Sequence, residues 1–181
     1  MKALLALLLL VPAAAAAQDD YALPRQEPKT DVRGWNIGPG IGIDQGGLGV
    51  QVQCRPVPRL LVFASGGYAL AGFGWNFGVG GRLLPYAKWC PYLTAMYGYN
   101  AAIVIQGAAD RNGIYYGPSI GIGVEDHRRR NYANFWRFGI VVPFRSAAYR
   151  AALDALRADP NFEVTGEPIP ISISAAYHFG L

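Results

Sequence analysis

Large apolar residues and small or polar residues alternate along most of the chain. In the segment 35–43, WNIGPGIGI, every second position carries a bulky apolar side chain or proline, with asparagine or glycine between them. Successive side chains of a β-strand point to opposite faces, so this pattern predicts a strand with one oily and one small or polar face. Similar alternation predicts eight strands in total, at about 35–43, 48–54, 60–70, 73–83, 89–105, 114–125, 132–145 and 169–181. Only Leu61 and Phe63 interrupt the alternation of the third strand.

The chemistry of the two faces decides the architecture. The small face consists mainly of glycine, serine, alanine, asparagine and glutamine, which fit inside a closed eight-stranded barrel. The oily face carries all four tryptophans, which are too bulky for that lumen: Trp35, Trp75, Trp89 and Trp136. We therefore predict an all-β, antiparallel up-and-down transmembrane barrel whose oily face meets lipid. The alternative is a soluble lipocalin-like barrel that binds a small apolar ligand, which requires the aromatic face to point inward.

Composition agrees with a membrane barrel. Hydrophobic residues make up 52 % of the 181 residues and charged residues only 15 %, against about 25 % charged in soluble domains. Beyond the first residues, no apolar run is long enough for a membrane-spanning helix. The apolar content instead lies in short alternating segments, as a barrel requires.

The first residues predict export. Lys2 precedes an apolar run over 3–11 and a small-residue stretch over 13–17, which is typical of a secretory signal peptide cleaved after Ala17. We expect a signal peptide at 1–17, a flexible periplasmic lead-in at 18–33 and one barrel domain at 34–181.

One connection differs from the others. Residues 146–160 lack glycine and are rich in helix formers, which predicts a short helix. With both termini in the periplasm, the long connections 106–113 and 146–167 lie outside the cell. The helix is interpreted as a cap over the barrel mouth, with a functional lid or receptor-binding element as the alternative.

The last segment, ISISAAYHFGL, alternates and ends in an apolar residue after Tyr177 and Phe179. It resembles the closing strand that the outer-membrane assembly machinery recognises. Together with the leader and the eight strands, the chain resembles the small OmpA/OmpX-type outer-membrane barrels of the porin-like superfamily. This resemblance implies a Gram-negative outer-membrane location, a structural or surface-interaction role, and contact with lipid, lipopolysaccharide and the assembly machinery. We expect a monomer without a cofactor. We expect no nucleic-acid partner either, because the only dense basic run, 128–130, is too short to suggest nucleic-acid binding.

Charged and amide side chains fall on the inward parity. They form a predicted polar network of the lumen: Gln51, Gln53, Arg82, Glu125 and Arg137, with Arg55 as a further candidate. An unpaired charge in a narrow lumen is costly, so we interpret the network as a structural plug. An ion-conducting path is the alternative.

Catalysis is not expected. Similar small barrels include lipid A-modifying enzymes, and His178 with Ser172 or Ser174 and Glu125 is the one candidate hydrolase site. The related deacylases carry a His-x-Ser pair, whereas Phe179 and Gly180 follow His178 here.

The cysteines leave a possible disulfide open, whereas the cysteines and histidines together predict no metal site. Cys54 and Cys90 both fall near the expected periplasmic rim, which favours a disulfide, but strand parity places them on opposite faces. Two histidines and two cysteines at wide spacing predict no metal site.

Overall fold

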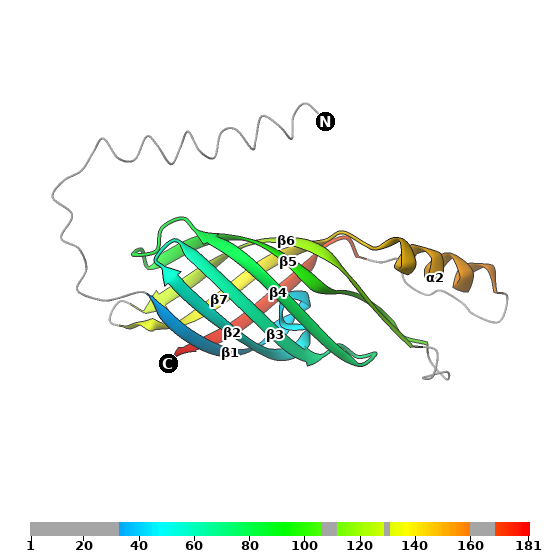
Figure 1. Ribbon diagram of the computed structural model, residues 1–181, viewed down its shortest axis with the longest axis horizontal. Coiled ribbons are helices and arrows are strands. Elements are labelled where there is room, and N and C mark those ends of the chain that lie inside the picture. Colours follow the sequence, from blue (N-terminus) through cyan, green and yellow to red (C-terminus); the bar gives the residue numbers. More distant parts are fainter. Residues whose placement is uncertain (1–32, 106–111, 129–130, 160–168) are drawn as a thin grey trace, which may run out of the picture.

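The computed structural model describes residues 33–105, 112–128, 131–159 and 169–181, and within them eight antiparallel strands close into a barrel (Figure 1). Each strand pairs with the next along the chain, and β8 returns to β1. The strands are β1 Gly34–Gly42, β2 Gly47–Val57, β3 Leu60–Tyr68, β4 Phe73–Arg82, β5 Trp89–Ile103, β6 Gly113–Arg128, β7 Asn131–Pro143 and β8 Ser172–Gly180. The expected eight-stranded up-and-down barrel is confirmed. The expected signal peptide and nearly all of the lead-in lie in 1–32, outside the described residues.

Closure of the barrel brings the two ends of the described domain together. β1 and β8 are antiparallel, with Asn36 opposite Gly180 and Ile41 opposite Ala175. The start of β1 and the end of β8 therefore lie at the same end of the barrel, which we call the terminal end (Figure 1). The opposite end, where β7 leads into the helix, is the loop end.

Burial alternates along the strands with the sign expected for a membrane barrel. In β4, every residue at the odd positions 73–81 is exposed and every residue at the even positions 74–82 is buried. All four tryptophans point outward, with 41 to 57 % of their surface exposed. The prediction for the oily face is confirmed, and the lipocalin-like alternative, which needs these side chains inside, is wrong.

The irregular start of the third strand has a packing explanation. Leu61 and Phe63 are buried and point inward, where they form an apolar cluster with Met96 and Val141. They lie opposite Gly80 and Gly78 of β4. A side chain at Gly78 would come within 2.6 Å of the Phe63 ring, so this glycine makes the space that the ring fills.

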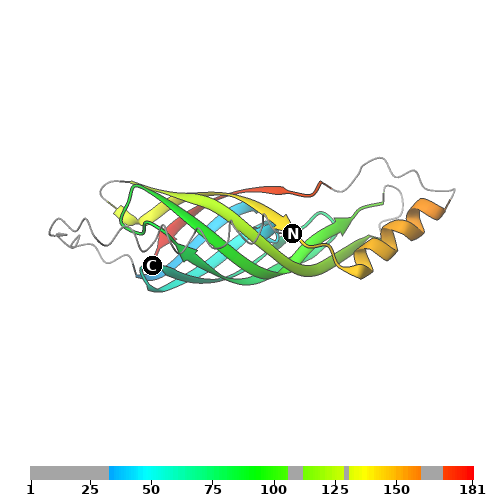
Figure 2. The ribbon, with the colours of Figure 1, turned by 90° about the horizontal axis from the view of Figure 1, so that it is seen from above.

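The connection from β7 to β8 contains the predicted helix, α2 (Ala147–Ala158). Ser146 caps it, because its Oγ accepts a hydrogen bond from the Tyr149 backbone N–H at 3.3 Å. The buried Tyr149 ring packs edge-on against Tyr115 of β6, with centroids 5.3 Å apart. α2 projects past the loop end of the barrel, so the predicted cap over the barrel mouth is not what these residues form (Figures 1 and 2). Among the described residues, no helix has the length and apolar character needed to cross a bilayer.

Candidate functional site

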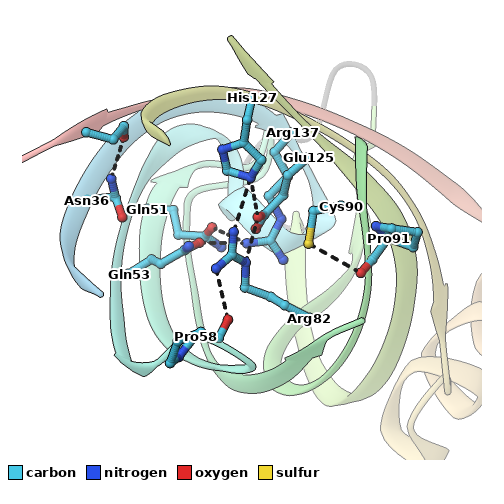
Figure 3. A network of polar contacts seen from close by, with 11 residues as sticks. Asn36, Gln51, Gln53, Pro58, Arg82, Cys90, Pro91, Glu125, His127 and Arg137 are labelled. Atoms are coloured by element: carbon cyan, nitrogen blue, oxygen red, sulfur yellow. Dashed lines mark hydrogen bonds and ion pairs between the residues drawn. The ribbon is translucent and has the colours of Figure 1, made fainter. Parts of the chain in front are cut away.

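The barrel interior gathers the buried polar side chains. All five residues of the predicted polar network lie there, each at most 2 % exposed (Figure 3). They come from four strands: Gln51 and Gln53 from β2, Arg82 from β4, Glu125 from β6 and Arg137 from β7. The strand alternation places each of them on the inward face.

Arg137 connects opposite walls of the barrel. Its Nη1 donates to the side-chain oxygens of Gln51 at 3.2 Å and Gln53 at 2.9 Å. Its guanidinium lies 4.1 Å from the centroid of the Tyr92 ring and 5.6 Å from that of Phe63. Two amide acceptors and two aromatic faces thus stabilise one buried cation.

A second group of side chains lies at the terminal end, and we call it the mouth cluster: Arg82, Cys90, Glu125 and His127. Arg82 Nε donates to Glu125 Oε2 at 2.8 Å, and both side chains are fully buried. The other arginine nitrogens approach Pro58 O at 3.0 Å and His127 Nε2 at 3.1 Å. The buried charges of Arg82 and Glu125 are therefore paired, as their desolvation demands.

Aromatic stacking continues from the mouth cluster toward β8. The buried Phe135 ring lies between His127 and His178, with centroids 4.9 Å from each, and is nearly parallel to the His178 ring. The Arg55 guanidinium lies 5.2 Å from the centroid of the same phenylalanine. Together these side chains occupy the interior at the terminal end.

The β1–β2 turn occupies the interior nearer the loop end. It forms a short 3-10 helix, η1 (Ile43–Gln45), of which Asp44 and Gln45 are buried. Ser65 Oγ donates to Asp44 O at 2.6 Å, and Asn76 Nδ2 donates to Ile43 O at 2.7 Å. The residues between the first two predicted strands thus form a turn, and this turn folds into the barrel.

Glycines make this inward turn sterically possible. Gly46 and Gly47 have φ values of 75° and 102°, which disfavour any residue with a Cβ. A side chain at Gly47 would also overlap the Tyr68 carbonyl oxygen. The Gly46-Gly47 pair therefore allows η1 to enter the lumen.

His127 was not among the predicted lumen residues, because the sixth strand was expected to end at about residue 125. β6 instead continues to Arg128, with His127 opposite Phe135. The sequence did contain a signal for His127: it lies two positions after Glu125, so strand alternation places both side chains on the inward face. The connection between β6 and β7 is shorter than expected, because the two strands stay paired through His127 and Phe135 up to Arg128 and Asn131.

Pairing also brings together three side chains with metal-ligating atoms. Cys90 of β5 lies directly opposite Glu125 of β6, and His127 follows two residues later on the same face. The ligand atoms of these three buried residues all lie within 4.8 Å of one another. Their spacing along the sequence predicted no such grouping, because it depends on the register between two strands.

The candidate hydrolase site is not assembled. Ser174 and His178 both face inward from β8, but they are four positions apart, or about 13 Å along a strand. The His178 ring nitrogens make no hydrogen bond among the described residues. Glu125 contacts Arg82 and His127 instead. No contact between these residues links a nucleophile to a base.

The two cysteines are both free. Cys54 of β2 is partly exposed and Cys90 of β5 is buried, and two further strands separate β2 from β5 in the barrel. The disulfide that the sequence left open does not form, because the thiols lie on opposite faces of non-neighbouring strands.

Comparison with known proteins gives a limited result. No protein-family model matches the chain, and no curated protein matches it. One similar solved structure is described as "De novo design of transmembrane beta-barrels"; it has 12 % identity and a TM-score of 0.48, over 84 % of this chain and 98 % of that one. Another is the N-terminal β-barrel domain of Pseudomonas aeruginosa OprF, with 10 % identity and a TM-score of 0.49, over 81 % of this chain and 96 % of that domain.

Proposed function

We propose that the chain is an integral outer-membrane β-barrel with a structural or surface-interaction role and a plugged lumen. The observation that carries this proposal is the inverted polarity of the barrel. Large apolar side chains cover the outer wall, while arginine, glutamate and glutamine are buried inside. A soluble protein gains stability from the opposite arrangement, and a bilayer favours this one.

Aromatic side chains at both ends of the wall support the membrane placement. At the terminal end, Trp136 contacts Tyr177, with ring centroids 4.9 Å apart. At the loop end, Trp75 stacks on Tyr116 at 5.2 Å. Tryptophan and tyrosine concentrate where the hydrocarbon core meets the headgroups, so these groups are candidates for the two interfacial girdles.

The lengths of the connections support an orientation. Two residues join β2 to β3 and two join β6 to β7 at the terminal end, whereas the connections after β5 and β7 at the loop end are long. Outer-membrane barrels have short periplasmic turns and longer external loops. We therefore place the terminal end in the periplasm and α2 outside the cell.

The interior supports a plug more than a channel. Arg137 joins opposite walls in one layer, and η1 fills another. Lipid and lipopolysaccharide would then be the partners of the outer wall and the loop end, the assembly machinery a partner during biogenesis, and the monomer the working unit.

Planar-bilayer recordings test the plugged lumen. The purified protein should produce little conductance, because side chains from opposite walls meet across the barrel axis. An open porin inserted into the same bilayers provides the positive control. Large, stable channels from this protein would refute the plug and favour the ion-conducting alternative.

A further inference from the structure

The mouth cluster brings three different metal-ligating atoms to one point. Cys90, Glu125 and His127 are fully buried, and they come from two adjacent strands whose register fixes their backbones (Figure 3). Their sulfur, oxygen and nitrogen ligand atoms lie within 4.8 Å of one another. With bonds of about 2.0–2.3 Å to a central Zn²⁺, tetrahedral ligand atoms lie roughly 3.3–3.8 Å apart, so side-chain shifts of about 1 Å would complete the set.

The contacts within the cluster show that its acceptor atoms converge on a cation. Glu125 Oε2 and His127 Nε2 lie 2.8 and 3.1 Å from two nitrogens of the Arg82 guanidinium. They also lie 3.1 Å from each other. The His127 tautomer decides whether Nε2 donates to Glu125 Oε2 or accepts from Arg82. In the tautomer that leaves Nε2 unprotonated, a nitrogen lone pair and a carboxylate oxygen lie side by side, which is the arrangement that a metal ion uses.

The second carboxylate oxygen is an independent observation. Glu125 Oε1 is buried and accepts no hydrogen bond from the described residues. A buried carboxylate oxygen without a donor is costly. A bound cation would satisfy it.

We propose that Cys90, Glu125 and His127 form a binding site for a divalent transition metal, which exchanges with the Arg82 guanidinium. One thiolate, one imidazole and one carboxylate are a donor set that suits Zn²⁺, with water in the fourth position. On binding, the Cys90 thiol releases its proton to solvent and the thiolate takes up one of the two metal charges. The site would add a metal-binding activity to a barrel otherwise described as structural.

Arg82 opposes metal binding, because the metal must displace its guanidinium from the buried Glu125 carboxylate. Arg82 Nη1 also donates to Pro58 O in the β2–β3 turn at 3.0 Å, a contact outside the three metal-ligating residues. Arg82 thus competes with the metal, so its removal should strengthen metal binding.

Cobalt titration tests the site through its absorption spectrum. Co²⁺ added to the full-length mature protein, folded in detergent, should bind at one equivalent and produce a sulfur-to-cobalt charge-transfer band. Excess Zn²⁺ should abolish that band by displacing the cobalt. The Arg82→Gln variant should bind Co²⁺ at least about tenfold more tightly, because a competing unit charge is gone.

The second cysteine provides a matched control. Cys54→Ser should keep the charge-transfer band, whereas Cys90→Ser should lose it, with heat-modifiable gel migration showing that both variants are folded. The absence of the band in the unmodified protein would overturn the proposal without any variant being needed. A band that survives Cys90→Ser but disappears in Cys54→Ser would also overturn it, because the sulfur ligand would then lie on the outer wall.

Discussion

Replacing Glu125 with leucine should lower the free energy of unfolding by about 3–5 kcal/mol, because the substitution leaves the Arg82 guanidinium buried without its carboxylate. Arg82 and Glu125 are both fully buried and 2.8 Å apart. Leucine is not smaller than glutamate, so the substitution leaves no cavity, and the loss would come mainly from the uncompensated charge. Equilibrium unfolding by denaturant in lipid vesicles, followed by tryptophan fluorescence, measures the difference.

The double variant separates charge pairing from packing. When Arg82→Met is combined with Glu125→Leu, neither charge remains, and most of the lost stability should return. If Glu125→Leu alone costs less than about 1 kcal/mol, water reaches the arginine and the mouth cluster is not sealed. If the double variant is as unstable as the single one, the network contributes through its shape alone.

The second large effect is expected on the outer wall. Ile122 is exposed and lies opposite Ile140, midway between the aromatic side chains of the two ends. Ile122→Arg should cost about 2–4 kcal/mol of unfolding free energy in a bilayer, because it places a charge near the membrane midplane. The same denaturant titration in vesicles provides the measurement.

Leu84 provides the matched control for this substitution. It is exposed in the β4–β5 turn at the terminal end. Leu84→Arg should cost only about 0–1 kcal/mol, because charge is tolerated near the interface. Equal costs at the two positions would mean that the outer wall does not span a hydrocarbon layer.

The strands and the identity of the inner face could be predicted because each depends on local alternation. Gln51, Gln53 and Arg137 share the inward parity of their strands, so their burial follows from period two alone. α2 was predictable for a similar reason, since helix propensity is local. Closure of the barrel was predictable as well, because eight strands that each have one oily and one small face can bury all their small faces only in a closed lumen.

Contacts between strands could not be predicted in the same way. The mouth cluster depends on Cys90 standing opposite Glu125, and a register shift of one residue would separate them. Phe63 was assigned no face because the space for its ring is supplied by Gly78 on the neighbouring strand. The inward fold of η1 depends on Ser65 and Asn76, which are remote in sequence.

The central claim is that the oily wall of this barrel faces lipid, and quenching of tryptophan fluorescence by brominated acyl chains tests it most directly. The protein would be folded into vesicles made with and without brominated lipid. Since all four tryptophans point outward, we expect strong quenching in brominated vesicles, and weaker quenching by an aqueous quencher than in the unfolded chain. Fluorescence that is unchanged by brominated lipid but lost to the aqueous quencher would contradict it.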